Sequence, residues 1–413
     1  MKTHTDQPTL RIKTFLATLS LGCLALGLAS CAAKPGRLAV QPTQAESAAK
    51  AKCAGENTKP AIECANSPSA IFDQNGRLWA VWDQGGKVYV SHSNDFGKTF
   101  SPAAAVNPAA EPVESGGESR PKIALSKIGA VYVAWTKGSG QPGAGEIRFS
   151  RSLDGGKTFT APVQIGGGAA EAGHSLESLA VNDRDYIYLA WVAGRNEAAA
   201  LYYAYSSDGG RGFHAEKKIA GPVCGDCRLA MKIDSKKFPA ILWRQAFEGR
   251  THGHALTHFA AKDQPGPIQR VSEDTCKNGN CSGHGPALAI APQGEYYAAW
   301  AGKGDAQGLY FSASLDHGKT FSPPIGFGRT PQAEHPDMLA DGQSIHLAWT
   351  ESDGKKTLLL GQSSIDGGLS WSPAKTLAET EGNADYPFVL AQQGRHYVAW
   401  QTAEWGFRLI AID

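Results

Sequence analysis

The stretch SLDGGKTF at residues 152–159 places an aspartate beside two glycines, a combination that suits a calcium loop or a catalytic carboxylate. The pattern recurs, with some divergence, as SNDFGKTF at 93–100, SSDGGRGF at 206–213, SLDHGKTF at 314–321 and SIDGGLSW at 364–371. A catalytic centre is not present five times in one chain, so we interpret the stretch as a structural turn. Internal repeats at a regular period indicate a repeat architecture.

A second repeated marker is a short apolar run that ends in tryptophan, such as VYVAW at 131–135. The tryptophans are 49 to 57 residues apart: Trp82, Trp135, Trp191, Trp243, Trp300, Trp349 and Trp400. Their equal position in every unit predicts packing between the units rather than exposure to a ligand. The chain therefore contains seven similar units.

Unit two shows the pattern within each repeat. Four short runs rich in Val, Ile, Tyr and Trp are separated by Gly and Asp turns: PKIAL at 121–125, VYVAW at 131–135, EIRFSRS at 146–152 and FTAPVQI at 159–165. Such runs indicate strands. Four antiparallel strands repeated about every 50 residues are typical of a propeller blade. The sequence predicts an all-β fold, a seven-bladed β-propeller over residues 59–413.

The last unit ends with FRLIAID at 407–413, a third strand with no fourth behind it. An unpaired edge strand promotes aggregation. We therefore expect an early segment, between about residues 36 and 64, to pair beside the final strand and close the ring.

The amino terminus has the layout of an export signal. A basic segment precedes an apolar run at about 15–28, which is too short to span a bilayer, and Leu28-Ala29-Ser30-Cys31 is similar to a bacterial lipobox. This predicts a lipoprotein signal peptide at 1–30, lipidation of Cys31 and a membrane anchor. Ala32 predicts the outer membrane, with the protein facing the periplasm or the cell surface. The alternative is an ordinary secretory peptide.

Two features of the composition bear on the segment after the signal peptide and on the class of ligand. Residues 31–58 are poor in large apolar side chains, which predicts a flexible tether that also contains the possible closing strand. The chain has 40 basic and 39 acidic residues, so no excess charge favours nucleic acid.

The motif Ser-x-Asp-x-Gly-x-Thr-Phe/Trp is the Asp-box, and over about residues 65–413 the chain resembles the sialidase-like, or BNR-repeat, propellers. A short Asp side chain accepts hydrogen bonds from the amides of its own turn, and Gly supplies a positive φ. Calcium requires more oxygen ligands than one Asp per turn provides. We therefore expect a structural role for these aspartates: Asp95, Asp154, Asp208, Asp316 and Asp366.

Polar residues precede or begin the innermost strands, on the propeller face opposite the Asp turns. Converging polar groups at a concave opening predict a ligand site. The expected ligand-binding residues are Arg120, His174, Arg228, His284, His335, Asp337, Asp385 and Tyr386. We expect this axial face to bind an unknown protein or glycan, as a binding or assembly module.

The resemblance also implies a second function, exo-sialidase activity on acidic glycans. Such enzymes hold a carboxylate with three arginines and use a Tyr assisted by a Glu as nucleophile. The matching residues here would be Arg120, Arg228, Arg244, Tyr386, Glu118 and Glu177. The Arg-Ile-Pro element of these enzymes is absent, and their catalytic domains have six blades, so binding is the favoured reading.

Six cysteines remain beyond the leader and Cys31, which in an exported protein predicts disulfides. Their spacing favours three pairs: Cys53 with Cys64, Cys224 with Cys227, and Cys276 with Cys281. A link between units four and five would use the last four of these cysteines. No cofactor is favoured. The alternative is a zinc or copper site, or a thiol-redox centre, built from Cys224, Cys227, Cys276, Cys281 and His284.

Overall fold

The structure is a computed structural model of the chain. It describes residues 59–140, 145–167, 173–194, 199–248, 251–273, 283–302, 307–330, 332–381 and 384–412. The predicted signal peptide, the lipidation site Cys31 and the tether lie outside these residues. Within this described part of the chain, no helix is long and apolar enough to cross a membrane.

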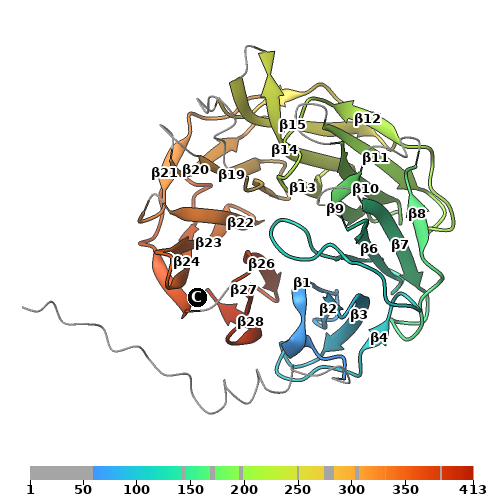
Figure 1. Cartoon of the computed structure of the whole chain (residues 1–413). Coiled ribbons are helices and arrows are strands. Elements are labelled where there is room, and N and C mark those ends of the chain that lie inside the picture. The colour runs from blue at the N-terminus through green and yellow to red at the C-terminus, as the bar shows by residue number, and fades with distance from the viewer. Residues whose placement is uncertain are drawn as a thin grey trace, which may run out of the picture. The chain divides into compact units, whose positions relative to one another are not determined.

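Seven antiparallel sheets follow one another around a ring (Figure 1). The first contains β1 (Asn66–Phe72), β2 (Leu78–Gln84), β3 (Lys87–Ser93) and β4 (Ala104–Ala105). The second contains β5 (Lys122–Leu125), β6 (Val131–Gly138), β7 (Gly145–Ser152) and β8 (Val163–Ile165). The third contains β9 (His174–Val181), β10 (Ile187–Ala193), β11 (Ala200–Ser206) and β12 (Lys217–Ala220).

The fourth sheet contains β13 (Ala230–Ile233), β14 (Pro239–Phe247), β15 (Thr251–Ala261), β16 (Gln264–Pro265) and β17 (Gln269–Arg270). The fifth contains β18 (Ala287–Ile290), β19 (Tyr296–Gly302), β20 (Gly308–Ser314) and β21 (Ile325–Phe327). The sixth contains β22 (Ala333–Asp341), β23 (Ser344–Ser352), β24 (Thr357–Ser364) and β25 (Lys375–Thr380). The seventh contains β26 (Phe388–Gln392), β27 (Arg395–Thr402) and β28 (Gly406–Ala411). The predicted seven-bladed β-propeller is confirmed.

The hydrophobic core is divided among the interfaces between neighbouring blades. Side chains alternate between the two faces of a strand, so each second strand contributes to two interfaces. Trp135 on β6, for example, packs with Trp79 and Val81 of the first blade. Trp82 closes the ring in the same way, because it packs beside Phe388 of the seventh blade. The seven repeated tryptophans are all buried, and each lies in the cluster shared with the preceding blade.

The repeated Asp turns connect the third and fourth strands of their blades. Ser152 Oγ donates to Asp154 Oδ1 at 2.7 Å, and the same oxygen accepts the backbone N–H of Thr158 at 3.0 Å. Equivalent bonds occur at Asp95, Asp208, Asp316 and Asp366. Gly156 has φ +79°, and a Cβ there would lie 2.6 Å from the Trp79 ring. The expected hydrogen bonding of the aspartates within their own turns is confirmed.

The closing segment differs from the prediction where it is described. Residues 59–64 form no strand, and Ile62–Cys64 is a 3-10 turn, η1, in contact with β28. Gln401 Nε2 donates to Ala65 O at 3.0 Å, so the segment is attached to the seventh blade through single bonds rather than a ladder. The rest of the expected closing strand, residues 36–58, lies outside the described residues.

The interface tryptophans should dominate stability. Replacing Trp191 by Ala removes a fully buried ring that packs with Tyr132 and Phe149 of the preceding blade. We expect Trp191→Ala to lower the free energy of unfolding in urea by about 3–5 kcal/mol. Leu369→Ala is the control, because Leu369 is 89% exposed. Equal losses in the two variants would contradict the assignment.

The Asp turns should make stability depend on acid. Hydrogen bonds from Thr99 and Ser93 lower the pKa of Asp95 from 3.8 to about 2. A carboxylate with a lowered folded pKa stabilises the fold above its unfolded pKa, and this contribution is lost as the pH falls through the folded pKa. The Tm gap between the wild type and Asp95→Asn should therefore be largest above about pH 4 and shrink towards about pH 2. A gap that does not change with pH would refute this role.

Candidate functional site

One connection, the axial loop (residues 106–121, between β4 and β5), extends into the middle of the ring (Figure 1). Its start is attached to the β2–β3 turn, since Glu111 N donates to Gly86 O at 2.8 Å. Trp135 Nε1 also donates to Glu111 Oε1 at 2.8 Å. The loop ends with Glu118 and Arg120. It therefore delivers one acidic and one basic side chain to the centre of the propeller.

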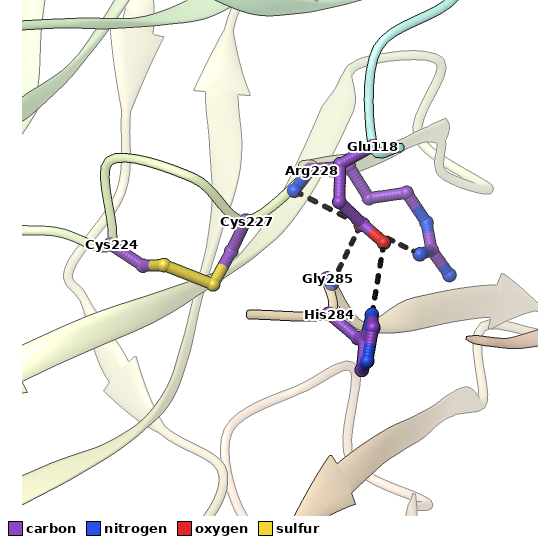
Figure 2. The surroundings of a disulfide bond; sticks show 6 residues. All are labelled: Glu118, Cys224, Cys227, Arg228, His284 and Gly285. Atoms are coloured by element: carbon purple, nitrogen blue, oxygen red, sulfur yellow. Dashed lines mark hydrogen bonds and ion pairs between the residues drawn. A yellow bond between two sulfur atoms is a disulfide. The ribbon is translucent and has the colours of Figure 1, made fainter. Parts of the chain in front are cut away.

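Glu118 connects the axial loop to three other blades, and Figure 2 shows its contacts with residues of blades four and five. Its Oε2 accepts hydrogen bonds from Arg228 Nη1 and from the backbone N–H of Gly285, each at 2.8 Å. Its Oε1 lies 3.4 Å from His284 Nδ1 and 3.1 Å from His335 Nδ1. The Glu118 side chain is only 9% exposed. This set of side chains, Glu118, Arg228, His284 and His335, is called the Glu118 cluster below.

The charges in the Glu118 cluster depend on one another. Burial alone would raise the pKa of Glu118, but Arg228 and the two histidines hold it well below its usual range. Burial likewise opposes the charged form of His284, but bonds to Glu118 and Glu334 raise its pKa to about 9. For His335, burial outweighs Glu118 and lowers the pKa. Glu118 therefore stabilises the charged forms of Arg228 and His284.

Tyr386 lies between two arginines. The Arg120 guanidinium carbon is 3.3 Å from the Tyr386 ring centroid, and that of Arg228 is 4.4 Å away. Arg120 also pairs with Asp385 at 2.9 Å and donates to the Tyr386 carbonyl at 2.8 Å. Lys122 Nζ donates to the Tyr386 hydroxyl at 3.4 Å. The tyrosine of the seventh blade is thereby bound to blades two and four.

A cavity of about 630 Å³ lies beside this assembly. Its lining includes Glu63, Asn66, Ser67, Gly116, His335, Asp385, Tyr386, Gln401 and Glu404. The wall therefore contains three carboxylates, several hydroxyl or amide groups, one histidine and one tyrosine. The two central arginines are not part of this lining.

Six of the eight expected ligand-binding residues come together at the centre of the propeller: Arg120, Arg228, His284, His335, Asp385 and Tyr386. The other two, His174 and Asp337, have structural contacts of their own. His174 is buried against Trp191, where burial lowers its pKa. Asp337 accepts the backbone N–H of Val389 at 2.7 Å and so connects blades six and seven.

The residues matched to sialidase catalysis have structural partners. Arg120 and Arg228 lie over the Tyr386 ring and pair with Asp385 and Glu118. Arg244, on β14, is buried beside His254, whose pKa is lowered by burial and then by this arginine. Glu177 accepts a hydrogen bond from Thr136, and burial raises its pKa. A catalytic role for this set stays a prediction.

Three groups of the site were not expected from the sequence: Lys122 at the Tyr386 hydroxyl, the Gly285 amide at Glu118, and Gln401 in the cavity wall. Lys122 could have been predicted, because it begins β5 only two residues after Arg120. Gly285 contributes only its backbone, and Gln401 lies on β27 well after the inner strand. Composition alone does not single out either residue.

Cys224 and Cys227 are joined by a disulfide, as predicted (Figure 2). Their sulfurs therefore offer no thiolate to a metal, which removes this pair from the alternative zinc or copper site. Cys64 is also disulfide-bonded. Its expected partner Cys53, together with Cys276 and Cys281, lies outside the described residues.

Comparison with known protein families finds no match, and comparison with curated proteins finds none either. Solved structures do match. The polysaccharide lyase Uly1 is 11% identical, with a TM-score of 0.55 over 89% of this chain and 95% of the lyase. An ulvan lyase of family PL25, bound to -[GlcA(1-4)Rha3S]-, is 13% identical, with a TM-score of 0.54 over 84% of this chain and 93% of that one.

The NanB sialidase of Streptococcus pneumoniae is 10% identical, with a TM-score of 0.48 over 82% of this chain and 83% of the sialidase. The neighbours thus include sialidase-like and polysaccharide-lyase propellers. At these identities the likeness concerns the fold.

The Glu118 cluster should be important for stability. Glu118→Ala leaves Arg228 buried without its carboxylate, and breaking a buried pair in this way costs about 3–5 kcal/mol. The double variant Glu118→Leu/Arg228→Met should recover much of that loss in urea unfolding. Lys217→Ala is the control, because the Lys217–Asp263 pair is partly exposed and worth about 1 kcal/mol or less. A loss no larger than the control would show that the cluster does not hold the blades.

Proposed function

We propose that this protein binds a saccharide in the axial cavity beside Tyr386. The observation that carries the proposal is the cavity wall, which combines an aromatic ring with many hydrogen-bonding groups. Ligand sites of this size use a few placed polar groups to fix orientation. Among the described residues, the oxygens Asp385 Oδ2 and Gln401 Oε1 have no hydrogen-bond partner. These two oxygens are buried in the wall, whereas the side chains of Glu63 and Asn66 are exposed at the cavity and offer polar groups complementary to sugar hydroxyls.

The charge of the wall favours a neutral or amino saccharide. Glu63, Asp385 and Glu404 line the cavity and would repel a carboxylated sugar. The arginines that could neutralise a carboxylate are paired with Asp385 and Glu118. The lyases with TM-scores above 0.5 support a saccharide as the ligand class, and one of them is bound to a saccharide.

A second candidate is glycan cleavage by an exo-sialidase-like or related mechanism. The observation favouring it is Tyr386, whose hydroxyl contacts Lys122, a cation near a potential nucleophile. This reading requires Arg120 or Arg228 to leave its present carboxylate partner when substrate binds.

The proposed location is the outer membrane, with lipid on Cys31 and the propeller exposed to the periplasm or the cell surface. The Cys224–Cys227 disulfide supports an oxidising compartment. Under this proposal the tether lets the axial face reach a glycan or a partner protein away from the membrane.

A glycan array followed by calorimetry on the best neutral or amino oligosaccharide tests the proposal. Gln401→Ala should weaken binding at least about tenfold, which corresponds to about 1.4 kcal/mol. Gln264→Ala is the matched control, an exposed glutamine on β16. Absence of saccharide binding, or equal affinity in both variants, would refute it. Turnover of a fluorogenic sialoside that disappears in Tyr386→Phe would instead support the second candidate.

A further inference from the structure

The Glu118 cluster contains three potential metal ligands on three blades. Glu118 comes from the axial loop before β5, His284 from the segment before β18, and His335 from β22. Each of the three residues offers one ligand atom, a ring nitrogen or a carboxylate oxygen, and these three atoms all lie within 4.8 Å of one another. We propose that these residues form a site for a divalent transition metal, with zinc as the best fit.

The spacing of the ligand atoms agrees with a tetrahedral ion. Zinc binds imidazole nitrogen and carboxylate oxygen at about 2.0–2.2 Å, so adjacent ligand atoms are about 3.4 Å apart. Glu118 Oε1 lies 3.4 Å from His284 Nδ1 and 3.1 Å from His335 Nδ1. These two separations are close to that value. The donor set, two imidazoles and one carboxylate, suits zinc better than calcium, which prefers six to eight oxygens.

The ring of His335 also lies beside that of His284, with the two ring centroids 4.0 Å apart. The buried Nδ1 of His335 faces Glu118 Oε1 at 3.1 Å, as Nδ1 of His284 does at 3.4 Å. Both imidazoles therefore direct a ring nitrogen to the same carboxylate oxygen, the arrangement that one shared ion requires.

The residues that contact the three proposed ligands are arranged as around a metal site. Metal-binding histidines usually donate their second ring nitrogen to a carboxylate, which fixes the ring and its tautomer. His284 Nε2 lies 3.3 Å from Glu334 Oε2. Arg228 and the Gly285 amide hold the other oxygen of Glu118, which leaves Oε1 directed to the histidines. The positive charge of Arg228 is thus balanced before an ion arrives.

The site differs from the cysteine alternative in both ligands and place in the fold. It shares only His284 with that set and needs no thiolate. His335 also lines the axial cavity, so a bound ion would lie next to any ligand in it. Three protein ligands leave a tetrahedral ion one position for water or for a ligand atom.

The test uses the purified full-length protein, stripped with EDTA and dialysed. Zinc is then added in competition with a chromogenic chelator, and the bound metal is counted by mass spectrometry. We expect about one zinc per wild-type chain and at least a hundredfold weaker binding in His335→Gln. Loss of an outer partner lowers metal affinity about 10–100-fold, so Glu334→Gln should fall in that range. His214→Ala is the control, an exposed histidine outside the cluster.

Folding is checked in parallel, because the Glu118 cluster also holds the blades together. Zinc should raise the Tm of the wild type and of His214→Ala but not that of His335→Gln, since only a folded site binds the ion. Circular dichroism of His335→Gln should match the wild type. Wild-type protein that binds no zinc, or His335→Gln that binds it equally well, would overturn the proposal.

Discussion

The packing of one tryptophan from each blade against the preceding blade is the constraint on which the rest of this structure depends. Each blade is a small sheet that cannot bury its own apolar face, so stability comes from the interfaces. The tryptophans supply the largest buried surfaces, and Trp82 makes the last interface equivalent to the others. Because the interfaces between the blades hold the ring together, the loops at its centre are free to carry polar side chains.

The polar centre has a different physical basis from the interfaces. Buried ion pairs gain little net free energy because desolvation offsets attraction, yet each partner depends on the other. Glu118 bonds to groups of blades four, five and six, and Arg120 pairs with Asp385 of blade seven. The ion pairs of Glu118 and Arg120 therefore hold the end of the axial loop against the other blades. This makes the centre specific in geometry, which is what a metal or ligand site requires.

The pairing of these charges within the fold also affects which ligands the cavity favours. Arginines that would hold a carboxylate in a sialidase-like site are paired within the fold, and the cavity wall is rich in carboxylates. The fold by itself does not determine the substrate, which depends on the residues of the site. The Asp turns on the opposite face differ from this centre, since their carboxylates are hydrogen-bonded within single turns.

The number of blades, their strand order, the buried tryptophans and the turn aspartates could all be read from the sequence, because each depends on periodicity and contacts within one repeat. The ligand-bearing loops could be located for the same reason. Their partners could not: Glu118 and Arg228 are 110 residues apart, and Arg120 and Tyr386 are 266 apart. The tertiary structure alone decides which charges neutralise one another, which histidines share the Glu118 carboxylate and which residues line the cavity. The reason is that these groups come from distant loops, which share one desolvated space only when the ring closes.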